Sequence, residues 1–248
     1  MMSYHYFCKL SIVVILMVVY YKYIKSLLIH YAPYMAEWLL LTKYFPKNDI
    51  EGTIELIMIA TSHVLFCIIL ILITPIQWPI ITLNWALIPI YFFYGLLLGI
   101  GCMGVSGLLC KIVVQIINTV KKGNSYDLKT CLTIGRGGWI KHHLQSIEIL
   151  PVYLSLLVLA MQVGSEEVIF RGILLNYFMP FGGVIAFFTA WSLFVLMQAF
   201  FMHRWQGAIF PMIGASVMGL VHSVLYLQIP ILWPLIIAHI TFFLFSVI

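Results

Sequence analysis

A charged cluster interrupts the otherwise apolar C-terminal part of the sequence, in the stretch Gly164–Gly172 that reads GSEEVIFRG. An ionisable group inside a membrane segment is costly unless it is paired, and such groups commonly mark functional sites. The charged residues between Ile149 and Ile248 are Glu166, Glu167, Arg171 and Arg204, and the histidines are His203, His222 and His239. The glutamates, Arg171 and the histidines are therefore the candidate site residues.

The spacing within the cluster separates the two glutamates by role. On a helix, Glu167 and Arg171 are four residues apart and share a face, so they are expected to form an ion pair. Glu166 is five residues from Arg171, roughly 140° round the helix axis, and faces elsewhere. We expect Arg171 to neutralise Glu167 and to hold the local structure, whereas Glu166 faces a cavity and is suited to act as a general base on water. The alternative is a buried cluster of ion pairs with no chemistry.

The three histidines follow on later predicted helices. His203 lies near the end of the next apolar segment, and His239 lies in the middle of the last one, within IIAHITFF. Facing helices of a bundle can bring such side chains to one site with the glutamates. His222 has no partner at a recognisable spacing, so we interpret it as a packing residue that is only a possible member of the site.

The composition indicates a membrane protein. Of the 248 residues, 63% are hydrophobic and 8% are charged, whereas soluble domains have about 25% charged residues. Because roughly 20 apolar residues cross the hydrocarbon core, the length predicts an all-α, polytopic transmembrane helix bundle of about seven or eight helices. We expect an integral membrane protein, of the bacterial plasma membrane, in contact with membrane lipids. The net charge of +5 is attributed to loop asymmetry and not to nucleic acid binding.

Three parts are predicted along the chain. Residues 1–118 are expected to form an N-terminal transmembrane scaffold. Residues 119–145 form a polar basic loop in which Asp127 is the only acidic residue, and the positive-inside rule places this loop on the cytoplasmic side. Residues 146–248 form a C-terminal core of four helices that carries the polar site.

Glycines in the scaffold predict close helix packing. The apolar run 86–118 is long enough for one tilted helix or two shorter ones. Within it, Gly95 and Gly99 have the GxxxG spacing that lets two helix backbones approach closely. Further glycines are expected to extend this small-residue surface, namely Gly101, Gly104 and Gly107. The four segments predicted in the C-terminal core are 147–178, 182–203, 207–228 and 231–248.

The C-terminal motifs resemble those of the CAAX protease and bacteriocin-processing family, which comprises intramembrane glutamate proteases of the prenyl-endopeptidase type. EEVIFRGIL, with Glu166, Glu167 and Arg171, resembles the first motif of the family. The second motif, FxxxH, corresponds to His203, and the third, HxxxN, corresponds to His239. The resemblance covers about 145–248.

The resemblance implies hydrolysis of a peptide bond without a covalent intermediate. Glu166 would activate a water molecule with the assistance of His203, and His239 would polarise the scissile carbonyl. Glu167 and Arg171 would hold the site. The implied substrate is a membrane-embedded peptide, a prenylated protein, a lipoprotein or a lipid, and a membrane protein partner is possible.

Two positions depart from the family motifs. Ala199 stands where FxxxH has Phe, and Phe243 stands where HxxxN has Asn. A phenyl ring cannot donate the hydrogen bond that the Asn would give to an oxyanion. The sequence therefore keeps open a non-proteolytic role, either acyl or group transfer on a lipid or lipoprotein, or a subunit or scaffold role in a membrane complex.

A metal site is the other alternative for the same residues. Two histidines and two glutamates can bind zinc. However, the HExxH motif of zinc proteases is absent, and Arg171 competes for one carboxylate. The expectation is therefore a site without metal or other cofactor.

Overall fold

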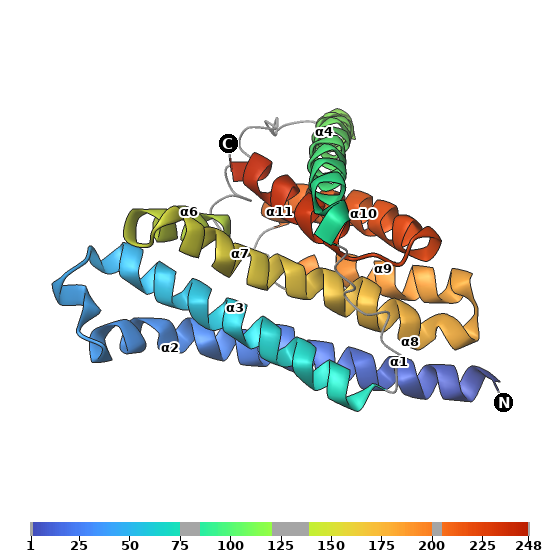
Figure 1. Cartoon of the computed structure of the whole chain (residues 1–248), viewed down its shortest axis with the longest axis horizontal. Helices are drawn as coiled ribbons and strands as arrows, with labels where there is room; N and C mark the ends of the chain where they lie inside the picture. The colour runs from blue at the N-terminus through green and yellow to red at the C-terminus, as the bar shows by residue number, and fades with distance from the viewer. Residues whose placement is uncertain (1, 75–84, 121–138, 200–204, 248) are drawn as a thin grey trace. The chain divides into compact units, whose positions relative to one another are not determined.

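The structure is a computed structural model that describes residues 2–74, 85–120, 139–199 and 205–247. Every regular element in these ranges is a helix (Figure 1). Five of the described helices are long and apolar enough to cross a membrane, and two shorter apolar helices accompany them. The predicted all-α membrane helix bundle is confirmed.

The first of two compact units consists of Met1–Ile80 and Lys141–Leu193. Within this unit α3 packs against both α2 and α7, and Figure 1 shows α2 and α7 on either side of α3. Its N-terminal elements are α1 (Met2–Val18), the π-helix η1 (Val19–Ile24), α2 (Lys25–Trp38), the 3-10 turn η2 (Leu41–Lys43) and α3 (Lys47–Ile73). Its later elements are α6 (Trp139–Ile149), α7 (Val152–Glu167), the π-helix η4 (Val168–Leu175), α8 (Asn176–Phe178), the 3-10 turn η5 (Met179–Phe181) and most of α9 (Gly183–Ala199).

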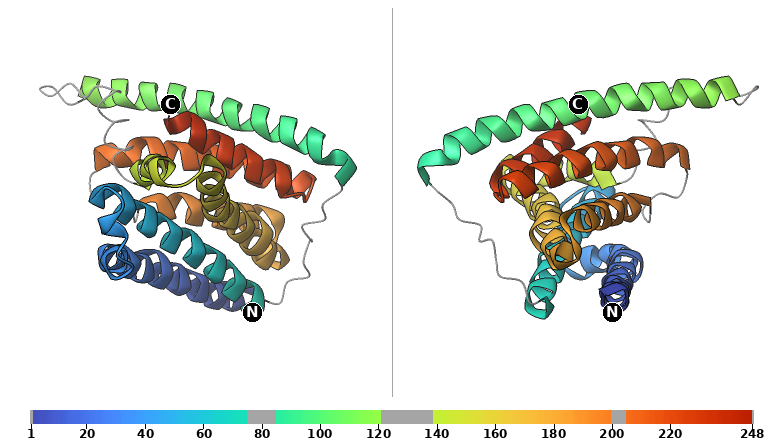
Figure 2. Two further views of the ribbon diagram at one scale, coloured as in Figure 1. Left: turned by 60° about the vertical axis from the view of Figure 1, so that its left-hand side comes forward. Right: turned by 90° about the vertical axis from the view of Figure 1, so that its right-hand side faces the viewer.

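The second unit consists of Ile81–Ile140 and Phe194–Ile248. Here α4 packs along α11 and against α10, and both views of Figure 2 show α4 beside α11. Its described elements are the 3-10 turn η3 (Trp85–Leu87), α4 (Ile88–Val120), the end of α9, α10 (Trp205–Gln228) and α11 (Trp233–Val247). The run predicted as one or two helices is thus a single helix of 33 residues.

Glycine packing in the second unit agrees with the prediction only in part. A Cβ atom on Gly95 would lie 2.6 Å from the carbonyl oxygen of Pro234, and one on Gly99 would lie 2.5 Å from that of Ala238. These two glycines therefore bring the α4 backbone against α11. The predicted extension of this surface is wrong, because a Cβ would meet no described atom within 4 Å at Gly101, Gly104 or Gly107.

Proline and glycine set the helix boundaries around the charged cluster. Pro151 immediately precedes α7, with φ of −52°, a value that its ring fixes and that suits a helix start. Gly182, between η5 and α9, has φ of 113°, which only glycine adopts without strain. The long helix with the glutamates therefore runs uninterrupted from Val152 to Phe181.

Both units combine residues from the two sides of the predicted boundary near residue 146. In the first unit, the helix with the glutamates packs on α3, which belongs to the predicted N-terminal scaffold. The polar stretch is helical at its two ends, up to Val120 in α4 and from Trp139 in α6, while 121–138 lie outside the described residues. The three-part division of the chain stays a prediction.

Candidate active site

The ion pair expected from the four-residue spacing is present. Arg171 Nη1 donates a hydrogen bond of 3.3 Å to Glu167 Oε1. The two side chains are 1% and 0% exposed, and removing a partner from such a pair would leave an uncompensated buried charge. The pair connects the last residue of α7 with η4, so it stabilises the helical conformation across the change from α-helix to π-helix.

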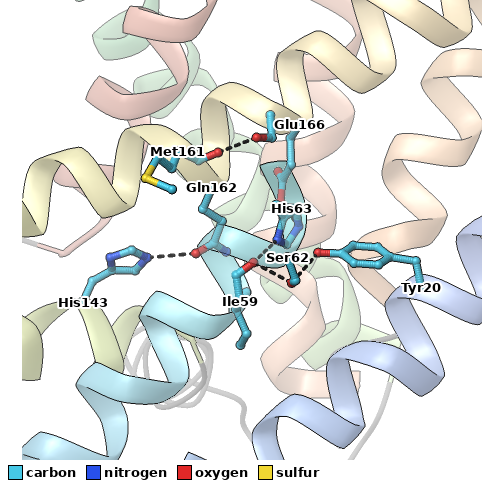
Figure 3. Close-up of polar contacts among 9 residues, drawn as sticks. Tyr20, Ile59, Ser62, His63, His143, Met161, Gln162 and Glu166 are labelled. Carbon is cyan, nitrogen blue, oxygen red and sulfur yellow. Dashed lines mark hydrogen bonds and ion pairs between the residues drawn. The ribbon is translucent and has the colours of Figure 1, made fainter. Parts of the chain in front are cut away.

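Glu166 faces a residue that the sequence did not indicate, His63 of α3. Glu166 Oε1 lies 3.7 Å from His63 Nε2. The exposed fraction is 6% for Glu166 and 0% for His63. Figure 3 shows the carboxyl group directed from α7 toward the imidazole on α3. Adjacent glutamates thus have different partners, as the helix geometry predicted, but the partner of Glu166 comes from the N-terminal half.

The orientation of the His63 ring is set by the carbonyl group of Ile59, one turn earlier on α3. His63 Nδ1 lies 3.0 Å from this carbonyl oxygen, which can only accept a hydrogen bond. Nδ1 therefore carries a proton. The other ring nitrogen, Nε2, is buried and makes no hydrogen bond within the described part of the chain, so Glu166 is the group toward which it points.

Tyrosines of η1 enclose the other side of the imidazole. Tyr20 and Tyr21 place their rings 5.3 Å and 5.6 Å from that of His63, both edge to face. Ser62 Oγ donates to the Ile59 carbonyl at 2.8 Å and is 2.8 Å from Tyr20 Oη (Figure 3). Because the serine proton is directed at Ile59, Tyr20 is the donor to Ser62. The tyrosine and the serine thus hold the histidine without occupying Nε2.

Two π-helices flank these contacts. The π-helix η1 includes Tyr20 and Tyr21, and η4, directly after Glu167, includes Arg171. Single π-turns in α-helices are frequent at functional sites, because the wider turn changes where side chains point. Each π-helix therefore supplies side chains to the polar cluster of the first unit.

A second polar group lies at the α6 end of the first unit, and its two histidines are outside the candidate membrane spans. His143 is 6% exposed, and its Nε2 donates to Gln162 Oε1 of α7 at 3.3 Å. Burial lowers the pKa of His143 to about 4. The neighbouring His142 Nε2 is 3.4 Å from Glu55 Oε1 of α3. Polar side chains thus connect α3, α6 and α7 at this end of the unit.

The candidate histidines predicted on the later helices do not lie in the first unit with Glu166 where the structure describes them. His222, on α10, and His239, on α11, are both buried in the second unit. The His239 ring lies 6.1 Å from that of Phe194, edge to face. His203 lies outside the described residues. The convergence of His203 and His239 with Glu166 therefore stays a prediction, as does the cavity next to Glu166.

The described residues also contain a cavity in the second unit. A cavity of about 200 Å³ between α4, α10 and α11 is lined by apolar and tyrosine side chains, none of which is a candidate site residue. Within the described ranges, no group of three or more His, Cys, Asp or Glu side chains is arranged to hold a metal ion. The Glu166–His63 contact is therefore the main chemical feature of the first unit.

Comparison with protein families identifies the segment that contains the glutamates. Residues 148–245 match the family model described as type II CAAX prenyl endopeptidase Rce1-like. This segment is Rce1-like. The match confirms the resemblance predicted from the motifs, and the Rce1-like segment begins in α6 and ends in α11. Comparison with curated proteins and with solved structures gave no match.

The Rce1-like segment and the apolar helices together define the class of protein. The chain is an integral membrane protein with an intramembrane protease-like segment. His63, however, lies outside the Rce1-like segment, on α3. Its sequence signal was present, because a histidine within the apolar run 53–74 is as costly as the later histidines. That signal gave no partner, since only the register of α3 against α7 determines what His63 faces.

Proposed function

We propose that the chain is an intramembrane endopeptidase in which Glu166 activates the water that hydrolyses a peptide bond. The observation that carries this proposal is the different pairing of adjacent glutamates within the Rce1-like segment. Glu167 is neutralised by Arg171, whereas Glu166 is 3.7 Å from a histidine that can exchange a proton with it. A buried carboxyl group beside a proton acceptor suits general acid–base catalysis.

The later motifs supply the remaining roles in this proposal. His203 assists Glu166 in activating water, and His239 polarises the scissile carbonyl, as the family resemblance implies. The reaction uses no metal or other cofactor. The substrate is a peptide, lipoprotein or prenylated protein held in the membrane among lipids, and the protein acts in the bacterial plasma membrane. Nucleic acid has no part in this function.

Cleavage of a farnesylated peptide with a CAAX-type C-terminus, by the full chain in liposomes, tests the proposal. The released C-terminal tripeptide is measured by mass spectrometry. Glu166→Gln should reduce the cleavage rate by about 10²–10⁴-fold, the usual contribution of a general base. The matched control is Glu148→Gln, since Glu148 is an exposed glutamate of α6 in the same Rce1-like segment. Wild-type cleavage by a folded Glu166→Gln variant would refute the role of Glu166.

The same assay distinguishes the proposed reaction without metal from a zinc-dependent one. A chelator should leave the cleavage rate unchanged. If the rate falls on chelation and returns with zinc alone, the candidate histidines and glutamates form a metal site instead.

A second function, group transfer on a lipid or lipoprotein without proteolysis, is favoured by one observation. Phe243 is 2% exposed and lies four residues after His239 on α11, so the two residues share a helix face. A phenyl ring there cannot stabilise an oxyanion. Phe243→Asn should raise peptide cleavage, by up to about 10²–10³-fold if the amide supplies the missing donor. A folded Phe243→Asn variant with no gain in cleavage would favour group transfer.

A further inference from the structure

We infer that His63, outside the Rce1-like segment, is a positioning residue that shares one proton with Glu166 and stores it while Glu166 acts on water. This inference rests on the proposed function of Glu166. It adds to the site a residue from α3, which neither the sequence motifs nor the family match includes. The contact between Glu166 Oε1 and His63 Nε2, at 3.7 Å in a buried setting, is the starting point.

The Ile59 carbonyl at Nδ1 determines how many protons the His63 ring and Glu166 hold between them. His63 Nδ1 must carry a proton, because the Ile59 carbonyl that it contacts at 3.0 Å cannot donate one. In a neutral imidazole Nε2 is then a bare acceptor. A bare Nε2 and an ionised Glu166 would place two lone pairs against each other, on residues that are 0% and 6% exposed. One proton between Nε2 and Oε1 removes this repulsion.

The site holds His63 in place for this exchange. Its ring is enclosed by Tyr20 and Tyr21, and Tyr20 is itself fixed by Ser62 and by stacking on Phe66 at 4.2 Å between ring centres. The separation of 3.7 Å between Nε2 and Oε1 is longer than an ordinary hydrogen bond, and we expect the shared proton to shorten it. The imidazole is therefore aimed at Glu166 by the surrounding rings and by the hydrogen bond of Nδ1 to the Ile59 carbonyl.

A balanced step follows from this arrangement. In the resting state the shared proton is on Glu166 Oε1 and His63 is neutral. Water transfers a proton to the other carboxyl oxygen of Glu166 while the Oε1 proton moves to His63 Nε2, and the hydroxide oxygen bonds to the scissile carbonyl carbon. When the C–N bond breaks, Glu166 gives its new proton to the leaving amine and His63 returns its proton to Oε1. Both residues are then in their initial states.

Other titratable groups surround His63, and the His63→Gln variant below leaves all of them in place. Those on elements packed against His63 are Tyr20 and Tyr21 of η1, Lys25 of α2, Cys67 of α3 and Glu166 of α7. Lys25 acts on both His63 and Glu166 through its charge. A variant that keeps all of these groups and changes only His63 therefore isolates its contribution.

The test that does not depend on substrate is ¹⁵N NMR of the histidine side chains in the full-length protein in lipid bilayers, with His63→Gln to assign the signals. The Nε2 signal of His63 should show a hydrogen-bonded acceptor in the wild-type protein. It should move to the position of a bare acceptor in Glu166→Ala, while the Nδ1–H signal stays in place. An Nε2 signal that does not respond to Glu166→Ala overturns the shared proton.

The kinetic test uses the farnesylated peptide assay. His63→Gln keeps a polar side chain but cannot store a proton, so kcat should fall by about 10²–10⁴-fold with KM unchanged. Because Glu166 and His63 titrate as a pair, the pH–rate profile of the wild-type protein should show two apparent pKa values, and one of them should be lost in His63→Gln. His30→Gln is the matched control: it makes the same substitution at an exposed histidine of α2, and it should leave kcat and the shape of the profile unchanged.

The two tests distinguish failure of this inference from failure of the proposed function. Absence of cleavage by the wild-type protein, with the Nε2 signal still dependent on Glu166, refutes the endopeptidase and retains the shared proton. Cleavage that requires Glu166 but proceeds at the wild-type kcat in His63→Gln refutes the role of His63 and retains the endopeptidase.

Discussion

Replacing Arg171 by methionine should show how strongly the buried ion pair stabilises the first unit. Methionine has a similar length to arginine and no charge, so Arg171→Met leaves Glu167 without its cation while it keeps most of the packing. Both side chains are nearly inaccessible, at 1% and 0% exposed, so solvent cannot replace the lost partner. Breaking a buried pair in this way typically costs about 3–5 kcal/mol.

The double variant separates the charge from the packing. Replacing Glu167 by leucine as well removes both charges, and buried pairs replaced by apolar side chains are often neutral to folding or more stable. The pair Arg171→Met and Glu167→Leu should therefore recover at least about 3 kcal/mol relative to the sum of the two single substitutions. Contacts of each side chain with other residues cancel in this double-mutant cycle.

The measurement is equilibrium unfolding of the full chain in detergent micelles, followed by the loss of helix signal. A matched control is the pair Lys47 and Glu51 on α3, which has the same four-residue spacing at 3.7 Å, with side chains that are 61% and 22% exposed. That pair should show a coupling of no more than about 0.5 kcal/mol. A coupling below about 0.5 kcal/mol between Glu167 and Arg171 is within the range of independent sites, and it would refute the assignment of the pair as the support of the cluster.

Two further predictions concern the remainder of each unit. The pKa of His143 is lowered from 6.5 to about 4, so the unfolded chain binds a proton there before the folded chain does. Stability should be intact above pH 6.5 and fall by about 3 kcal/mol as the pH drops to 4, at 1.36 kcal/mol per pH unit, as measured by the unfolding midpoint. In the second unit, Gly99→Ala should lower the unfolding temperature because its Cβ would lie 2.5 Å from the Ala238 carbonyl oxygen. Gly104→Ala, with open space around it, should be neutral or gain up to about 1 kcal/mol from helix propensity.

Each of these predictions has a result that would contradict it. His143→Gln should remove the fall in stability between pH 6.5 and 4, so an unchanged pH dependence in that variant would assign the effect to another group. Equal unfolding temperatures for Gly99→Ala and Gly104→Ala would mean that α4 does not lie against α11 at Gly99.

The helices and the local pairing of Glu167 with Arg171 could be predicted because both depend on residues close in sequence. An apolar run of about 20 residues has few alternatives in a membrane, and a four-residue spacing on a helix fixes which side chains meet. For the same reason the GxxxG spacing correctly indicated Gly95 and Gly99. The other glycines lie on different faces of α4, because its buried positions continue at Cys102, Ser106 and Cys110 and not at Gly101, Gly104 or Gly107.

The partner of Glu166 could not be predicted, because it depends on how α3 is shifted along α7. A shift of one helical turn, about 5.4 Å, would place Ile59 or Cys67 where His63 now lies. The sequence contained both of the required facts, a costly histidine in one apolar run and a costly glutamate in another. It contained no information on their distance.

That pairing changes what the N-terminal half contributes to the site. A charged carboxylate in a membrane segment is costly, so the group must find a partner on another helix or stay neutral. The first family motif supplies Glu166, Glu167 and Arg171, and Arg171 is already bound to Glu167. An ionisable side chain that faces Glu166 in the first unit, His63, is on α3. The predicted scaffold therefore supplies the histidine that faces Glu166, and variation in α3 should change the acid–base behaviour proposed for Glu166 without altering any of the motifs.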